Sequence, residues 1–309
     1  MTPVGNGVTL TYAKGCEPSG GGAFARDGLR WLFADCELII ACLGYTAELE
    51  GEEGDAFNAD AGGDRAKLGL PGRQQEFLDF LLTLGKPVVV VLCTGSPVDL
   101  RVAQENANAI LCAWYPGEAG GVAIAEALLG KTNPGGRLPV TFPKCLEDLP
   151  PFHSYAMAGR TYRYATAEPL YRFGFGLSYT TFAYRQLRLD RTTLKAGESV
   201  TARVTITNTG TVAGDDVAQL YLQPLAPSVP APRWHLEGFQ RVQLAPGESR
   251  EVSFTVKAEQ FQHYTDGGQP FLDAGSYRIH LGGGQPDDPH AGGLHADLAI
   301  AQTNVLMPN

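Results

Sequence analysis

The hydrophobic residues in the first half of the chain fall into two kinds of segment. Three segments are continuous apolar runs, at residues 38–44, 88–92 and 110–114. Each run is too short for a helix and is typical of a strand buried on both faces. Apolar residues recur at helical spacing in three further segments: over 74–84, after Ser96 with Pro97 in the first turn, and over 121–129. This order predicts an α/β fold with a doubly wound, mostly parallel sheet.

Ligands of such sheets bind beyond the carboxyl ends of the strands. We therefore expect a functional site in the loops that follow the three predicted strands. These loops are residues 45–70, 93–98 and 115–121.

After residue 187 the hydrophobic pattern changes to a period of two. Val200, Ala202, Val204 and Ile206 share one face of an expected strand, and similar rows follow at 218–222, 252–256 and 277–281. Turn sequences such as KAGES, NTGT and APGES separate the rows. About seven short strands over roughly 115 residues predict an all-β sandwich of the fibronectin III kind.

Between these two parts the periodicity lapses. Residues 151–186 are rich in Pro, Gly and aromatic residues, and they are too aromatic for a flexible linker. We expect an ordered connector packed on both domains. The predicted organisation is an α/β sandwich domain at 1–150, the connector at 151–186 and the β-sandwich at 187–309.

Charge and composition argue against several classes of function. The 309 residues carry a formal net charge of −9 without a block of Lys and Arg, which argues against nucleic acid or an anionic membrane as a partner. No apolar run approaches the ~20 residues that span a bilayer, and the N-terminus lacks a signal-peptide pattern. The six cysteines and six histidines lack ligand spacing, so we expect buried, reduced thiols in a cytoplasmic protein without a metal. Dinucleotide and Walker motifs are missing, and we expect no cofactor.

An acidic run follows the first predicted strand. Residues 48–55 hold four Glu and one Asp, and their mutual repulsion with partial burial raises the pKa of at least one carboxyl. A carboxyl that stays protonated near neutral pH is what a general acid requires. Runs of charged residues are more often solvated loops. On the acidic run alone, a solvated loop is the favoured interpretation. A Ca²⁺ loop is disfavoured, because the Asp/Asn spacing of an EF-hand is missing.

A Gly-Gly-Asp-Arg sequence at 62–65 lies in the same loop. Asp64 and Arg65 either anchor this long loop or place Arg65 against a ligand oxygen. Considered in isolation, the anchoring role is favoured.

Several segments of the chain, taken in order, resemble those of family 3 glycoside hydrolases. YAKGC (12–16) resembles a turn early in the family's second domain, and LEGEEGDAFNADAGGDRAKLGLPGRQQ (49–75) resembles its acid/base loop. GSPVDL, AWYPGEAGG, GRTYRY and PLYRFGFGLSYTTF follow in the family's order, and LEGFQRVQLAPGES resembles its fibronectin III-like domain. Each piece alone is weak, but together they cover nearly the whole chain.

The resemblance implies a retaining, exo-acting β-glycosidase, either a β-glucosidase or a β-xylosidase. Members of the family hydrolyse terminal β-linked sugars from glycosides or oligosaccharides. Their Asp nucleophile comes from an N-terminal barrel, and their Glu acid/base comes from the second domain. The two carboxyls of a retaining site lie about 5 Å apart, so both domains must meet over one bond.

The family's acid/base pattern, laid on this loop, selects Glu52. Glu53 is the second choice and Glu50 the third, and Asp64 and Arg65 are the candidate substrate-binding residues. The nucleophile is not in this chain.

The resemblance also implies that a barrel, and a first sheet strand before YAKGC, are missing. We therefore expect an exposed sheet edge or apolar face, covered by a barrel-bearing polypeptide or a missing N-terminal domain. The expected role is half of a glycosidase site, inactive as this chain alone, within a homo- or hetero-oligomer. The alternative is a non-catalytic carbohydrate-binding or scaffold module.

Overall fold

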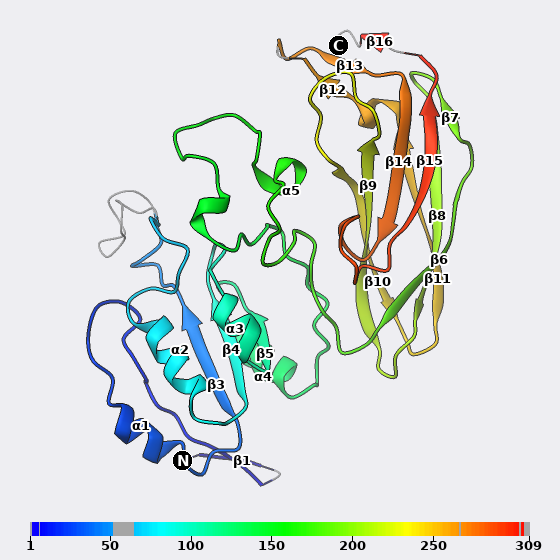
Figure 1. The fold of residues 1–309 in the computed structure, drawn as a ribbon. Coiled ribbons are helices and arrows are strands. Elements are labelled where there is room, and N and C mark those ends of the chain that lie inside the picture. The colour runs from blue at the N-terminus through cyan, green and yellow to red at the C-terminus, as the bar shows by residue number, and fades with distance from the viewer. Residues whose placement is uncertain (1, 6, 52–64, 266, 303, 306–309) are drawn as a thin grey trace. The chain divides into compact units, whose positions relative to one another are not determined.

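The computed structural model describes residues 2–5, 7–51, 65–265, 267–302 and 304–305 (Figure 1). The chain divides into two compact units, an α/β unit and a β-sandwich unit. The α/β unit comprises Met1–Ile124 with Phe142–Asp148, and the sandwich unit comprises Ala125–Thr141 with Leu149–Asn309. The predicted order, an α/β fold followed by an all-β sandwich, is confirmed.

Three parallel strands form the sheet of the α/β unit, in the order β3 (Ile39–Gly44), β4 (Val88–Cys93) and β5 (Ala109–Cys112). These are the three predicted apolar runs. The central strand β4 is the most deeply buried, and its Val90, Val91 and Leu92 are 0% exposed. The branched side chains of its valine run suit this covered, pleated position. The parallel register brings the carboxyl ends of all three strands to one edge of the sheet.

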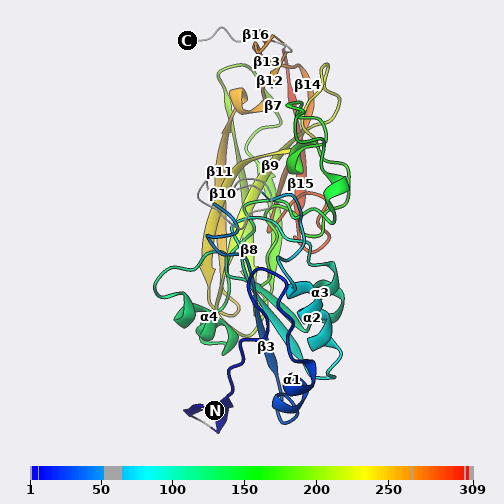
Figure 2. The ribbon, with the colours of Figure 1, turned by 90° about the vertical axis from the view of Figure 1, so that its left-hand side faces the viewer.

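Helices α1 (Arg26–Leu32), α2 (Gln74–Leu82) and α3 (Arg101–Asn106) lie on the same side of this sheet (Figure 2). The predicted stripe of α2 is buried, with Leu78 and Leu81 each 1% exposed. Helix α4 (Gly120–Leu128) agrees with its prediction to one residue. The N-terminal residues add a small antiparallel hairpin of β1 (Thr2–Gly5) and β2 (Val8–Leu10).

The prediction of a helix that begins at Pro97 is wrong. Helix α3 begins at Arg101 instead, and Leu100 occupies its N-cap position. Ser96 therefore does not cap the helix, because its hydroxyl and the Pro97 carbonyl both accept hydrogen bonds from Arg65.

Strand β3 also departs from the prediction, because only one of its faces is buried. Ile39, Ala41 and Leu43 are buried, whereas Ile40 is 41% exposed and Cys42 is exposed. Among the described residues β3 pairs only with β4, and α1 to α3 cover a single face of the sheet. The prediction of buried thiols is therefore wrong for Cys42, and the other five cysteines are only partly buried.

The sandwich unit consists mainly of two sheets whose strands are mostly antiparallel. The larger has the order β10-β9-β14-β15-β7, in which β7 is parallel to β15, and the smaller has the order β11-β8-β6. A third small sheet has the order β12-β13-β16. The strands are β6 (Phe182–Leu189), β7 (Thr193–Leu194), β8 (Ser199–Asn208), β9 (Gly214–Pro224), β10 (His235–Leu244), β11 (Ser249–Lys257), β12 (His263–Tyr264), β13 (Pro270–Leu272), β14 (Gly275–Gly282), β15 (Leu294–Ile300) and β16 (Asn304–Val305). Short helices lie at Leu146–Asp148, Thr161–Tyr164 (α5) and Ala258–Phe261.

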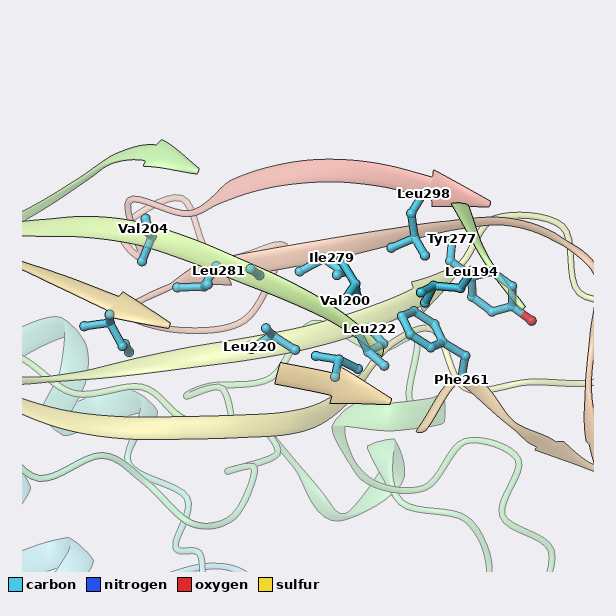
Figure 3. Close-up of a cluster of buried hydrophobic side chains, with 14 of the residues drawn as sticks. Leu194, Val200, Val204, Leu220, Leu222, Phe261, Tyr277, Ile279, Leu281 and Leu298 are labelled. Atoms are coloured by element: carbon cyan, nitrogen blue, oxygen red, sulfur yellow. The ribbon is translucent and has the colours of Figure 1, made fainter. Parts of the chain in front are cut away.

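The predicted rows of alternate residues form the core between the two larger sheets. Figure 3 shows Val200 and Val204 of β8 in one cluster with Leu220 of β9 and Ile279 of β14, and each is 0% exposed. Within the described residues, seven of the sandwich strands are 7 to 11 residues long. They are thus longer than the short strands predicted.

The aromatic connector is ordered and packs on the sandwich. Tyr162 stacks on Phe173 with ring centroids 4.4 Å apart, and its hydroxyl accepts a hydrogen bond from the Leu236 amide. Gln219 of β9 donates to the Gly174 carbonyl at 3.0 Å. The boundaries at 150 and 186 stay predictions.

Candidate functional site

The loops that follow β3, β4 and β5 meet at one carboxylate, that of Glu50. Glu50 lies in the loop after β3, Gly95 and Ser96 follow β4, and Tyr115 follows β5. These are the three loops in which the sequence predicts a site. Since the carboxyl ends of parallel strands share one edge, residues far apart in the chain meet there.

Both oxygens of Glu50 accept hydrogen bonds from the protein. Oε2 accepts from the Tyr115 hydroxyl at 2.5 Å and from the Gly95 amide at 3.3 Å. Oε1 accepts from the Ser96 hydroxyl. The side chain of Glu50 is 20% exposed, so these protein donors replace most of the water around the carboxylate.

Arg65 approaches the same carboxylate from the far end of the loop. Its Nη1 lies 3.6 Å from Oε1 of Glu50, and it donates to Ser96 Oγ at 2.5 Å and to the Pro97 carbonyl at 2.9 Å. Its Nη2 donates to two further carbonyls, those of Lys67 and Leu68. The guanidinium also lies 4.1 Å from the centre of the Tyr45 ring, a favourable cation–π distance.

Backbone geometry allows this close approach of strand ends. A Cβ on Gly44, whose φ is 141°, would lie 1.7 Å from the Cys93 carbonyl oxygen. The buried Gln74 side chain bonds to both the amide and the carbonyl of Gly44, each at 2.7 Å. A Cβ on Gly95 would lie 2.7 Å from the Tyr115 ring, so only glycine lets that ring reach Glu50.

Trp114 directly precedes Tyr115 and has a left-handed backbone, with φ at 55°. This conformation is uncommon for a residue other than glycine and costs on the order of 1–3 kcal/mol. The Trp114 ring packs edge-to-face on Phe142, with centroids 6.2 Å apart. The turn after β5 is therefore held in an unfavourable conformation by side-chain packing.

These contacts set the protonation states of the cluster. Partial burial alone would raise the pKa of Glu50, but the Ser96 and Tyr115 hydroxyls, the Arg65 charge and the Gly95 amide outweigh it. The pKa of Glu50 is therefore lowered, and the carboxylate is ionised at neutral pH. Burial, together with the hydrogen bond to Glu50, raises the pKa of Tyr115, so its hydroxyl stays a donor.

Of the residues predicted for the site, Glu50 and Arg65 are brought together. Glu52, Glu53 and Asp64 lie outside the described residues. Ser96 and Tyr115 were not singled out from the sequence. The available signal was their position directly after predicted parallel strands.

A hollow of about 310 Å³ lies at the end of β3, where Tyr12, Lys14 and Cys42 contribute to its lining. Within the described part of the chain, no group of three or more His, Cys, Asp or Glu is arranged to hold a metal ion. No described helix is long and apolar enough to cross a membrane.

Comparison with known proteins identifies both units. Residues 32–179 match the model of the glycosyl hydrolase family 3 C-terminal domain, and residues 216–285 match that of the fibronectin type III-like domain. The chain is 34% identical to a β-xylosidase of Formosa agariphila over 92% of its own length, and 36% identical to a periplasmic β-glucosidase of Salmonella typhimurium over 80%. A β-glucosidase of Listeria innocua, solved with isofagomine, superposes over 93% of this chain with a TM-score of 0.77 and 28% identity.

The chain spans well under half of each of these proteins. It covers 39% of the Formosa agariphila protein, 32% of the Salmonella typhimurium protein and 40% of the Listeria innocua chain. Matches to both domain models, in the order seen in the fold, account for more than half of the 309 residues. The chain therefore belongs to glycoside hydrolase family 3, and it carries that family's C-terminal domain and fibronectin III-like domain.

Proposed function

We propose that this chain supplies the general acid/base glutamate of a retaining β-glycosidase, and that the Asp nucleophile comes from a barrel outside the chain. One observation carries the proposal: Glu50, in the acidic loop, is held where three parallel strands end. That edge is where α/β sheets bind their ligands. The substrates would be terminal β-linked glucosides or xylosides, as the names of the relatives suggest.

We assign the acid/base role to Glu52, with Glu53 as the second choice. Glu50 suits the role least, because its carboxylate is ionised and already accepts three hydrogen bonds. A general acid must carry a proton near the working pH. Asp64 and Arg65 remain proposed substrate contacts, although the described hydrogen bonds of Arg65 go to the protein.

The test is a hybrid enzyme in which this chain replaces the matching 39% of the Formosa agariphila β-xylosidase. The hybrid should hydrolyse aryl β-xylosides or β-glucosides, and the chain alone should not. Glu52→Gln should slow hydrolysis of a phenyl glycoside by about 10²–10⁴-fold and a dinitrophenyl glycoside far less, because a good leaving group needs no protonation. Azide, which replaces the water that needs a general base, should restore turnover of the dinitrophenyl glycoside, because breakdown of the glycosyl-enzyme limits the rate for that substrate.

Glu48→Gln is the matched control, because Glu48 is an exposed carboxyl of the same loop. It should leave the rate unchanged. If Glu52→Gln and Glu53→Gln both behave like this control in an active hybrid, the acid/base assignment fails. If Glu50→Gln does so as well, the chain is a scaffold module. Robust turnover by the chain alone would refute the need for a barrel.

A further inference from the structure

We propose that Glu50 is a positioning residue for the acidic loop, tying the start of the loop to its end and to the edge of the sheet. The inference rests on the proposed function, because it concerns how the acid/base loop is held. Glu50 and Arg65 are described residues on either side of the segment 52–64. The ion pair and the shared Ser96 hydroxyl join these two points of the chain.

The hydrogen bonds around Ser96 have only one consistent direction. Arg65 can only donate, so Ser96 Oγ accepts from it. The single proton of Ser96 is then free for Glu50, which as a carboxylate can only accept. The Arg65–Ser96–Glu50 chain therefore runs in one direction, from the guanidinium through the hydroxyl to the carboxylate.

The second oxygen of Glu50 ties the loop to the other strands. Tyr115 comes from the turn after β5 and Gly95 from the turn after β4, and both donate to Oε2. Glu50 is thus an acceptor shared by the ends of two strands other than its own. A glutamine in its place would present an NH2 group to one of these donors, so an amide cannot satisfy all of them.

The arrangement has a direct consequence for a catalytic loop. Only Gly51 separates Glu50 from Glu52, the proposed acid. Loss of the contacts of Glu50 would therefore loosen the backbone that leads to Glu52. Misplacement of a reacting group by about 1 Å can cost on the order of 10²-fold in rate. Glu50 therefore acts through another residue and does not itself exchange a proton with the substrate.

The first experiment uses the chain alone and requires no activity. Hydrogen exchange is compared between wild type, Glu50→Gln and the control Glu48→Gln. Glu50→Gln should raise exchange at least tenfold in peptides covering residues 45–51, 65–70 and 94–97, and the control should not. Unchanged exchange in Glu50→Gln would overturn the proposal, whether or not the hybrid enzyme is active.

The second experiment measures kinetics in the hybrid enzyme described above. Glu50→Gln should lower kcat about ten- to hundredfold with KM unchanged, equally for phenyl and dinitrophenyl glycosides and without rescue by azide. Tyr115→Phe should produce a smaller loss of the same kind, and the double variant should be no worse than Glu50→Gln. A loss much larger for phenyl than for dinitrophenyl glycosides, together with faster turnover of the dinitrophenyl glycoside on addition of azide, would make Glu50 the acid/base and overturn the positioning role.

Discussion

Each of the two units of this protein contains a carboxylate that contacts a tyrosine and an arginine, but the surroundings differ. In the α/β unit, Glu50 accepts from Tyr115 and pairs with Arg65 at 3.6 Å. In the sandwich unit, Asp216 accepts from the Tyr184 hydroxyl at 2.6 Å and from Arg137 at 2.7 Å. The side chains of Asp216 and Arg137 are 3% and 9% exposed, against 20% and 11% for Glu50 and Arg65.

The difference shows that surroundings decide what such a trio does. Asp216 joins β9 to the 125–141 segment inside one unit, where the contacts can only stabilise the fold. Glu50 lies at strand ends beside a loop, where the same contacts can also determine the position of neighbouring residues. The variants below separate these two roles, beginning with the largest expected effect.

Replacement of Arg137 by Met should cause the largest loss of stability. It leaves the buried Asp216 carboxylate without its cation, and breaking a buried pair in this way costs about 3–5 kcal/mol. Hydrogen exchange of β8 and β9, compared between wild type and Arg137→Met, would measure the change in the free energy of unfolding of the sandwich. Arg241→Met is the control, because Arg241 pairs with Asp215 at the surface and should contribute less than about 1 kcal/mol. Equal losses in the two variants would contradict this contrast.

Replacement of Leu220 by Ala should come next. Leu220 is 0% exposed in the sandwich core, and a buried Leu-to-Ala change costs about 2–5 kcal/mol. Ile40→Ala, on the open face of β3, should cost the α/β unit less than about 1 kcal/mol, because Ile40 is already 41% exposed. Urea denaturation, followed by hydrogen exchange in each unit, would measure the loss of stability in both variants. A large loss from Ile40→Ala would mean that this face is covered in solution.

These two sites also illustrate what the sequence can predict. The rows that contain Leu220 and Val200 follow from a period of two, because one-sided burial in a sheet repeats at every second residue. Strand β3 has the same apolar composition on both faces, and only the arrangement of the helices shows that Ile40 and Cys42 are exposed. The hydrophobic pattern of a segment therefore predicts a strand, but it does not show which faces of that strand are covered by helices.

The sequence predicts which loops form the candidate site, but it does not predict which side chains bond to Glu50. The acidic run and Arg65 stand out by composition and by their place after a strand. Ser96 and Tyr115 lie 46 and 65 residues from Glu50, and no local signal relates them to it. Their meeting depends on strand order, which a short-range pattern does not encode. The failed helix start at Pro97 has the same cause, since Arg65 engages that turn from 32 residues away.

Glu50→Gln should destabilise the α/β unit by less than the sandwich variants. The unsatisfied donors around it cost about 1–3 kcal/mol, towards the low end because water reaches part of the cluster. The effect on kcat in the hybrid enzyme should nevertheless exceed that of Arg137→Met at a temperature where both stay folded. If Arg137→Met slows the folded enzyme as much, the two trios do not differ in role.

Acid should produce the smallest effect. Because the folded-state pKa of Glu50 is lowered, its contribution is complete above the ordinary carboxyl pKa of about 4.3 and is lost as pH falls through the lowered value. Arg65 is the charged group that faces it among the described residues. The difference in Tm between wild type and Glu50→Gln should therefore shrink in acid. A difference that is constant with pH would contradict an ionised Glu50.

The left-handed turn after β5 contains Trp114, whose fluorescence can report on the conformation of that turn. Its indole lies against Phe142 and is covalently next to the tyrosine that reaches Glu50, so its emission depends on how that turn is folded. Trp31 is 81% exposed and Trp234 is 6% exposed in the other unit, so conversion of both to Phe would leave one reporter. Fluorescence of that variant would report a change in this turn without any added dye.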